Sequence, residues 1–409
     1  MGNFSIALSG LKADSVALNT IGNNLANLNT TAFKGQTASF EDLFYQQIGE
    51  SGSGDAIQTG AGVKVSGTNT NFLQGSLLPT SNSTDMALAG NGFFVVQQNG
   101  VQSLTRAGNF QLSSGGSLIT VDGQQVMGYG AVNGVVNQNA GLQPITIPVG
   151  ANEAAQATGN FSVTANLNAS ATVGTTFTTP IPMFDSLGSS HQATVTYTKT
   201  GTNTWDYTVA LPAGDAAGVP SNNTGTLTFD PTGKLIAPTG SVANITFPGL
   251  TDGASDMSFN WNLNDSSGNP TVTQLATASS NNGTIQDGFT SGVYQSFTVD
   301  PSGVITAQFS NGRTSTIGQV AVATVANTAG LTVTGNNNFT TTAASGLASI
   351  GVAGTGGRGT VDDDALEQSN VDISTEFSNL IVAQRAFEAN SKTVTTFDTV
   401  TQDTLAMIR

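Results

Sequence analysis

An apolar residue recurs every seven positions at both ends of the chain. The C-terminal series is Leu366, Ile373, Leu380, Phe387, Val394, Thr401 and Ile408, and the N-terminal series is Phe4, Leu11, Leu18 and Leu25, followed three residues on by Ala7, Ile21 and Leu28. Only Thr401 and Asp14 interrupt the pattern. A seven-residue repeat keeps one stripe of a helix facing a partner helix. Both ends are therefore predicted to form coiled-coil helices that pack on each other or on neighbouring copies, which favours assembly over catalysis.

Charge and cysteine content exclude several classes of protein. The chain has 409 residues, of which 9% are charged, against roughly 25% in an ordinary domain. Its net charge of −15 and its eleven lysines and arginines argue against a nucleic-acid partner. No apolar run is long enough to predict membrane insertion, and the N-terminus lacks the pattern of a cleaved signal peptide. The absence of cysteine excludes disulfides and thiolate metal sites.

The segments between the terminal helices have mainly β patterns, with short apolar runs bounded by Gly, Asn, Asp and Pro. We expect a multidomain α+β fold in which discontinuous, mainly-β domains are nested between helices that pack together. Asp372 is predicted to cap the second helix, with Glu376 in its first turn. The predicted parts are a helical coiled-coil domain (1–30 and 370–409), a connecting segment (31–75 and 353–369), an inner β domain (76–148 and 281–352) and an outer inserted β domain (149–280).

Turn residues predict several hairpins within the β domains. Residues 87–89 and 93–96 flank Gly90-Asn91-Gly92, and residues 193–198 and 205–209 flank a second turn. Two further turns share an Asp-Pro-x-Gly pattern, at 230–233 and 300–303. These patterns predict structural turns and not catalytic loops.

Candidate catalytic and cofactor motifs are weak. His191 is the only histidine, and we expect it at the surface or at a strand edge, so neither a catalytic triad nor a transition-metal site is predicted. Residues 354–359 match G-x-G-x-x-G, but no helix start follows them, which favours a flexible linker. The run Asp362–Asp364 lacks the ligand spacing of a calcium loop and is expected to be a solvated turn. The sequence predicts no enzyme activity, cofactor or metal.

Two glycines and two phenylalanines each allow two interpretations. Gly10 and Gly22 lie inside the first predicted helix, where they indicate either a weak helix or points of close helix approach. Phe40 and Phe44 stand four residues apart and would share one face of a short helix. This face would pack on a neighbouring domain, and a second interpretation arises only from the resemblance described below.

Several segments resemble the family of bacterial flagellar rod and hook proteins. Near the N-terminus these are residues 9–27, SGLKADSVALNTIGNNLAN, and 31–34, TAFK. Near the C-terminus they are residues 366–372, LEQSNVD, and 379–392, NLIVAQRAFEANSK. Residues 91–96, NGFFVV, and 105–110, TRAGNF, match family segments of the inner β domain. The long central block is absent from the shorter rod members of this family, so the resemblance is to its hook members.

The resemblance implies a structural subunit of the flagellar hook, a curved hollow tube that acts as a universal joint between motor rod and filament. It implies self-assembly through the terminal helices, with the distal rod protein, the hook–filament junction protein and the hook cap as further partners. It also implies export by the flagellar type III apparatus to the outside of the cell without a cleaved signal peptide. An aromatic followed four residues later by a hydrophobic resembles the export-gate motif of such proteins, which gives Phe40 and Phe44 their second interpretation.

Two alternatives lead to different expectations. A distal rod or hook-associated protein of the same family would share the terminal segments. A secreted all-β adhesin would bind glycans through exposed aromatic side chains such as Trp205, Tyr207 and Trp261 in the central block.

Overall fold

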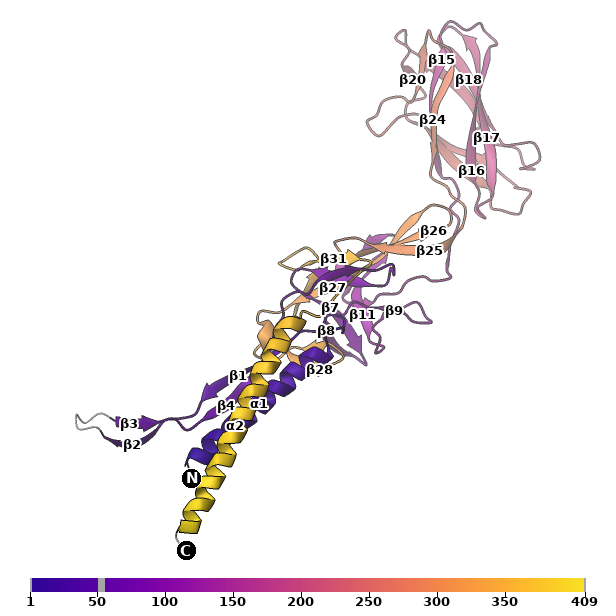
Figure 1. Cartoon of the computed structure of the whole chain (residues 1–409). Helices are drawn as coiled ribbons and strands as arrows, with labels where there is room; N and C mark the ends of the chain where they lie inside the picture. The colour runs from indigo at the N-terminus through magenta and orange to yellow at the C-terminus, as the bar shows by residue number, and fades with distance from the viewer. Residues whose placement is uncertain (1, 51–55, 408–409) are drawn as a thin grey trace. The chain divides into compact units, whose positions relative to one another are not determined.

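The computed structural model describes residues 2–50 and 56–407, in which two long helices lie at the chain ends and strands fill the middle (Figure 1). The chain forms two compact units. The first contains Met1–Val149, Phe297–Ala307 and Ser315–Arg409, and the second contains Gly150–Ser296 and Gln308–Thr314. The prediction that the terminal helices pack together and that the chain between them is rich in strands is confirmed.

The terminal helices are α1 (Gly2–Ala26) and α2 (Ile373–Met407), and they lie side by side in the first unit (Figure 1). Asp372 caps α2 as predicted, since its Oδ1 accepts a hydrogen bond from Thr375 N at 2.7 Å. Glu376 lies in the first turn, where a negative charge is favourable to the helix dipole. At 1.5 Å per residue, the 35 residues of α2 span about 50 Å.

Two strand pairs follow α1 in the region predicted to be a connecting segment. β1 (Gln36–Asp42) pairs with β4 (Val63–Thr70), and β2 (Gln46–Glu50) pairs with β3 (Ala56–Thr59). The short helix expected around Phe40 and Phe44 is wrong, because Phe40 lies within β1 and Phe44 follows that strand. Backbone pairing with β4 therefore overrides the helical spacing of these two residues.

Antiparallel strand pairs form the β part of the first unit. Hydrogen bonding links β27, β11, β7, β8, β29 and β28 in this order, and the rings of Phe72, Phe93 and Phe339 pack edge to face in its core. The strand bounds are β7 Phe93–Gln98, β8 Val101–Thr105, β9 Gln111–Leu112, β10 Leu118–Ile119, β11 Gln125–Val132, β12 Val135–Val136, β13 Gln143–Pro144, β26 Val304–Phe309, β27 Thr314–Thr324, β28 Thr332–Gly335, β29 Asn338–Thr340 and β30 Ser349–Val352.

Two strands close to the C-terminal helix correct the sequence-based expectations for residues 353–369. β31 (Thr360–Asp363) pairs with β6 (Met86–Ala89), and β32 (Ala365–Glu367) pairs with β5 (Leu77–Pro79). Asp362 and Asp363 therefore lie in a strand and not in a solvated turn. The expected hairpin between 87–89 and 93–96 is also wrong, because β6 takes this distant partner. Burial of Val361 and Glu367 favours this pairing over a free linker.

The second unit has two five-stranded sheets whose buried faces contribute to one core. The predicted hairpin of residues 193–198 and 205–209 is confirmed, because β17 pairs antiparallel with β18. One sheet has β16 Thr176–Phe184, β17 Ser190–Gly201, β18 Thr204–Ala210, β19 Thr224–Phe229 and β20 Leu235–Ala237. The other has β21 Ser241–Phe247, β22 Met257–Asn262, β15 Asn160–Asn168, β23 Val272–Leu275 and β24 Ser280–Gln286. The strands β14 Asn152–Glu153 and β25 Gly292–Val299 pair with each other.

The second unit extends past residue 280, where the sequence placed the end of the outer domain. The reason is that β24 pairs antiparallel with β15, which holds residues 280–286 in this unit. Elsewhere in the unit, the Asp-Pro-x-Gly sequence at 230–233 forms the predicted turn between β19 and β20. Asp230 Oδ1 accepts from Thr232 N at 2.8 Å, and Gly233 has a φ of 84°, which favours glycine.

Candidate functional site

The facing sides of α1 and α2 are held in an antiparallel register by two polar contacts. Asn24 Nδ2 donates to Glu376 Oε1 at 3.1 Å, and Asn390 Nδ2 donates to Asp14 Oδ2 at 2.8 Å. Asn24 also holds β1, because its amide bonds both the N–H and the carbonyl of Gln36. Asp14, which interrupts the N-terminal heptad series, thus has a partner within the same chain.

The predicted seam residues of α1 are only partly covered by the rest of the chain. Among the side chains of α1 that the structure describes, from Ser5 onward, the buried ones are small or polar: Ala7, Ala13, Thr20 and Asn24. The predicted seam residues Leu11, Leu18, Ile21, Leu25 and Leu28 are half-buried, and Leu28 lies just beyond the end of α1. The side chain of Phe4 lies outside the described residues.

α2 leaves its apolar residues even more open. None of its residues from Ile373 to Met407 is buried. Of the predicted seam, Leu380 and Val394 are half-buried, Ile373 is 46% and Phe387 38% exposed, and Ile408 lies outside the described residues. Further exposed apolar side chains are Phe377, Ile381, Val382, Val400, Leu405 and Met407. A helix with so much exposed apolar surface has a strong drive to pack on a partner.

A groove of about 370 Å³ runs between α1, α2 and β1. Ala17, Ile21, Phe40 and Val382 contribute apolar walls. Within the described residues, the buried Oε2 of Glu376 has no hydrogen-bond partner, although Oε1 is bonded to Asn24. The groove thus combines apolar walls with the carboxylate of Glu376, which is held on one side by Asn24.

The two phenylalanines of the candidate export motif differ in exposure. Phe44 is 93% exposed and Phe40 is 45% exposed. Phe40 contributes to the groove described above, whereas Phe44 lies beside the exposed Tyr45. No helical face unites them, since Phe40 is in a strand.

The two interior glycines of α1 differ in their surroundings. A Cβ added at Gly10 would lie 2.7 Å from Asn390 Nδ2, whereas a Cβ at Gly22 would meet nothing within 4 Å among the described residues. Close helix approach is thus found at Gly10 and not, within one chain, at Gly22.

This difference leads to a paired prediction. Gly22→Ala is expected to stabilise α1 by about 1 kcal/mol, the usual gain in helix propensity. Gly10→Ala should gain less, because its methyl group would displace Asn390 from the 2.8 Å hydrogen bond to Asp14. Thermal melts followed by circular dichroism at 222 nm compare the two variants. Equal stabilisation of α1 by both substitutions would contradict the close approach at Gly10.

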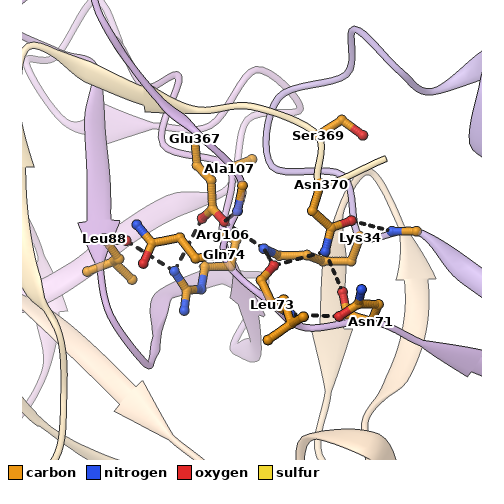
Figure 2. Close-up of polar contacts among 12 residues, drawn as sticks. Lys34, Asn71, Leu73, Gln74, Leu88, Arg106, Ala107, Glu367, Ser369 and Asn370 are labelled. Carbon is orange, nitrogen blue, oxygen red and sulfur yellow. Dashed lines mark hydrogen bonds and ion pairs between the residues drawn. The ribbon is translucent and has the colours of Figure 1, made fainter. Parts of the chain in front are cut away.

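A network of buried charged side chains joins the segment that follows α1 to the segment that precedes α2 (Figure 2). Glu367 accepts from Lys34 Nζ at 2.6 Å through Oε1 and from the Arg106 guanidinium at 3.2 Å through Oε2. The Lys34 and Glu367 side chains are 1% and 0% exposed. Burial lowers the pKa of Lys34 and of Arg106 below their ordinary values, although Glu367 acts in the opposite direction on both. Two buried cations thus depend on a single carboxylate.

Backbone groups complete this network, as Figure 2 shows for several of them. Lys34 Nζ donates to Leu73 O at 2.8 Å, and Arg106 donates to Leu88 O at 3.2 Å. Asn370 lies nearby, where its Nδ2 donates to the carbonyls of Asn71 and Leu73 and its Oδ1 accepts from Gly35 N. The network therefore joins the strand region after α1, the inner strands and the segment before α2.

Sequence reasoning quoted the segments that carry these residues but did not predict that they meet. Lys34 stands in TAFK, Arg106 in TRAGNF and Glu367 in LEQSNVD. The scarcity of charge was a usable signal. The chain has only eleven lysines and arginines, and one of them stands in each of two segments that resemble the family, so a structural role for these two cations could have been expected. Nothing in the local sequence, however, reveals a contact across 333 residues.

His191 differs from its predicted position at the surface or at a strand edge. It is the second residue of β17 and is only 8% exposed, because three loops fold over it. Burial alone would lower its pKa, but hydrogen bonds to Asp215 and Asp185 outweigh burial and raise the pKa. Burial would likewise raise the pKa of Asp185, yet hydrogen bonds from His191 and from the backbone amides of Ser189 and Leu187 hold it well below the usual range.

The aromatic residues on which an adhesin would depend are buried. Trp205 and Trp261 are 0% exposed and Tyr207 is 4% exposed, and all three belong to the core of the second unit. Glycan binding through these side chains is therefore contradicted. Among the described residues, no helix combines the length and the hydropathy needed to cross a membrane.

Comparison with known families matches most of the chain. The models described as flagellar basal body rod protein and as flagellar basal body rod FlgEFG protein C-terminal match residues 4–34 and 363–407. The models of the flagellar hook protein FlgE/F/G D1 domain and of the flagellar basal body protein FlaE D2 domain match residues 87–168 and 163–289. These four matches include both terminal helices.

Relatives match the chain over almost its whole length. It is 32% identical to flagellar hook protein FlgE of Treponema pallidum, over 98% of each chain. It is 35% identical to flagellar hook protein FlgE of Escherichia coli, over 97% of this chain and 98% of that one. The crystal structure of Helicobacter pylori flagellar hook protein FlgE2 shares the fold, with a TM-score of 0.55 at 15% identity over 71% of this chain and all of that one. The chain thus belongs to the flagellar hook protein family.

Proposed function

We propose that this chain is the structural subunit of a flagellar hook, and that copies of it polymerise into a curved hollow tube. The observation that carries the proposal is α2, a helix of 35 residues in which no residue is buried although many are large and apolar. In the polymer, the heptad stripes of α1 and α2 would pack as coiled coils against the helices of neighbouring copies. The relatives named as hook proteins support this role.

The proposed mechanical role is that of a universal joint between the motor rod and the filament. Torque would pass through the packed terminal helices, and bending would come from sliding between weakly charged surfaces of the β units. In a chain with 9% charged residues, such surfaces can move past each other without separating many ion pairs. We also propose that the terminal helices, the connecting segment, the inner β domain and the outer β domain act as separate mechanical parts, with the outer domain extended past residue 280 to include β24.

The proposed route and partners follow from the family. The chain would leave the cell through the flagellar type III apparatus without cleavage of a signal peptide, and would assemble outside the cell under the hook cap. One end of the assembled tube would meet the distal rod protein, and the other end would meet the hook–filament junction protein. The high exposure of Phe44 supports a contact of the Phe40–Phe44 segment with the export gate, and the position of Phe40 in the helix groove supports packing instead.

Phe387→Asp tests the assembly surface. The variant is expected to form no tubes, because a charge placed in an apolar seam must be desolvated without a partner. Electron microscopy of the purified chain under polymerising conditions shows the result. Thr399→Asp introduces the same charge on the opposite side of α2, where the native residue is polar and exposed, and should still give tubes. Normal tubes from Phe387→Asp would refute the seam. Tryptophan fluorescence checks that the second unit is intact, since both tryptophans lie in its core.

A further inference from the structure

The second unit contains a cluster of one histidine and three aspartates, of which His191 and Asp185 are buried, Asp215 is half-buried and Asp252 is exposed. His191 Nε2 lies 3.0 Å from Asp185 Oδ2 and 3.5 Å from Asp252 Oδ2, while His191 Nδ1 lies 2.8 Å from Asp215 Oδ2. His191 is the second residue of β17, and the three aspartates come from the loops β16–β17, β18–β19 and β21–β22. The ligand atoms of His191, Asp185 and Asp252 all lie within 4.8 Å of one another.

Hydrogen bonds outside the cluster orient these carboxylates. Asp185 Oδ1 accepts from the backbone N–H groups of Leu187 and Ser189 at 2.8 and 2.9 Å, which leaves Oδ2 directed at the imidazole. Asp252 is arranged in the same way, since its Oδ1 accepts from Ala254 N at 3.0 Å. In both aspartates one oxygen is held by the backbone and the other faces His191.

Asp215 has a different role from the other two carboxylates. In the neutral imidazole with its proton on Nδ1, that N–H donates to Asp215, and the lone pair of Nε2 can bind a metal ion in place of the hydrogen bond between Nε2 and Asp185. Metal-binding histidines typically donate their other ring N–H to a carboxylate in this way. A backbone hydrogen bond from Thr251 N to Asp215 O at 3.0 Å ties the loop of Asp215 to that of Asp252.

We propose that His191, Asp185 and Asp252 form a binding site for Zn²⁺, with Asp215 orienting the histidine. In a tetrahedral site with bonds of about 2.0–2.2 Å, neighbouring ligand atoms lie about 3.3–3.6 Å apart. The separations of 3.0 and 3.5 Å therefore need only a small adjustment. Imidazole with carboxylates suits zinc, whereas calcium and magnesium prefer oxygen ligands alone.

The balance of charge in the cluster also favours a cation. Three carboxylates face one imidazole, so negative charge remains in excess even when the imidazole carries a proton. In the described part of the chain, none of the three carboxylates forms an ion pair with a lysine or arginine. A divalent ion would neutralise this excess and fasten three loops to β17. The site would thus stiffen one end of the second unit, independently of the terminal helices.

Zinc titration of the untagged, full-length chain after treatment with a chelator tests the proposal. Isothermal titration calorimetry is expected to show one zinc per chain. His191 is the only histidine, so imidazole signals in ¹⁵N–¹H spectra report this site alone. Zinc should shift Nε2 while Nδ1 stays protonated. Absence of saturable binding, or binding that leaves the imidazole signals unchanged, would overturn the proposal.

Three substitutions that each remove one carboxylate separate a built site from adventitious binding. Asp252→Asn, at a partly exposed ligand, should abolish detectable one-to-one binding, and Asp215→Asn should weaken binding by about 10–100-fold, as for other residues that orient a ligand. Asp206→Asn, an exposed aspartate of β18 in the same unit, should bind as the unaltered chain does. Equal affinity in Asp252→Asn and Asp206→Asn would show surface binding only and refute the site. Unchanged tryptophan fluorescence confirms that each variant is folded.

Discussion

Glu367→Gln is expected to lower the free energy of unfolding of the first unit by about 3–5 kcal/mol. The substitution preserves the shape of the side chain but removes the only carboxylate that pairs with Lys34 and Arg106 in the described network. Both cations would stay buried without a counter-charge, which costs more than the original pair contributed. Urea unfolding followed by far-ultraviolet circular dichroism measures the loss.

The surface pair of Lys64 and Glu41 supplies the control. Its atoms lie 2.6 Å apart, as close as those of Lys34 and Glu367, but its side chains are 55% and 47% exposed. Glu41→Gln should therefore change the free energy of unfolding by about 1 kcal/mol or less. If both substitutions cost the same, burial of the network is not what makes Glu367 important.

The same variant should acquire a characteristic dependence on pH. Without Glu367, burial lowers the pKa of Lys34 further below its ordinary value, since the opposing effect of the carboxylate is gone. The unfolded chain then binds a proton that the folded chain has released, so stability rises with pH in the range between the two pKa values. The loss caused by Glu367→Gln should consequently shrink toward pH 10.

Phe161→Ala is expected to destabilise the second unit by about 3–5 kcal/mol, the usual cost of emptying a buried phenylalanine site. Phe161 is 1% exposed, stacks on Trp261 with ring centroids 5.7 Å apart and meets Phe259 edge to face at 5.5 Å. Both tryptophans of the chain, Trp205 and Trp261, lie in this core. Tryptophan fluorescence during urea unfolding therefore reports the second unit alone.

Val219→Ala provides the matched control, because Val219 belongs to the same unit but is 87% exposed. It should leave the fluorescence transition within about 0.5 kcal/mol of the unaltered chain. Glu367→Gln should leave the same transition unchanged, since Glu367 belongs to the first unit. A fluorescence midpoint that does not move in Phe161→Ala would contradict the assignment of Phe161 to the shared core.

Structural features that depend only on residues adjacent along the chain, such as a helix cap or a hairpin, could be predicted from the sequence. Asp372 identified the start of α2 because a cap and the first turn of its helix are adjacent along the chain. The alternation in residues 193–198 and the following turn identified β17 and β18 for the same reason. The family resemblance then supplied the assembly role that neither pattern could name.

Features that depend on distant residues could not be predicted. The apolar residues of β6 indicate a strand but do not say whether β7 or β31 pairs with it. Phe40 and Phe44 have helical spacing, yet hydrogen bonds with β4 hold the backbone around Phe40 in a strand. His191 was expected at the surface because its three aspartates come from separate loops, and no local pattern connects Asp252 with a histidine 61 positions earlier.

The ion pair of Lys34 and Glu367 also constrains the order in which the chain folds. The second unit consists mainly of one continuous stretch, Gly150–Ser296, whereas the ion pair closes a loop of 333 residues. Closing long loops is entropically costly and slows folding. The second unit is therefore expected to form early, while the first stays open until both ends have arrived. If the proposed export delivers the chain unfolded, α1 and α2 would stay apart until nearly the whole chain has been exported. Their exposed apolar residues would then be less able to pack on other copies too early.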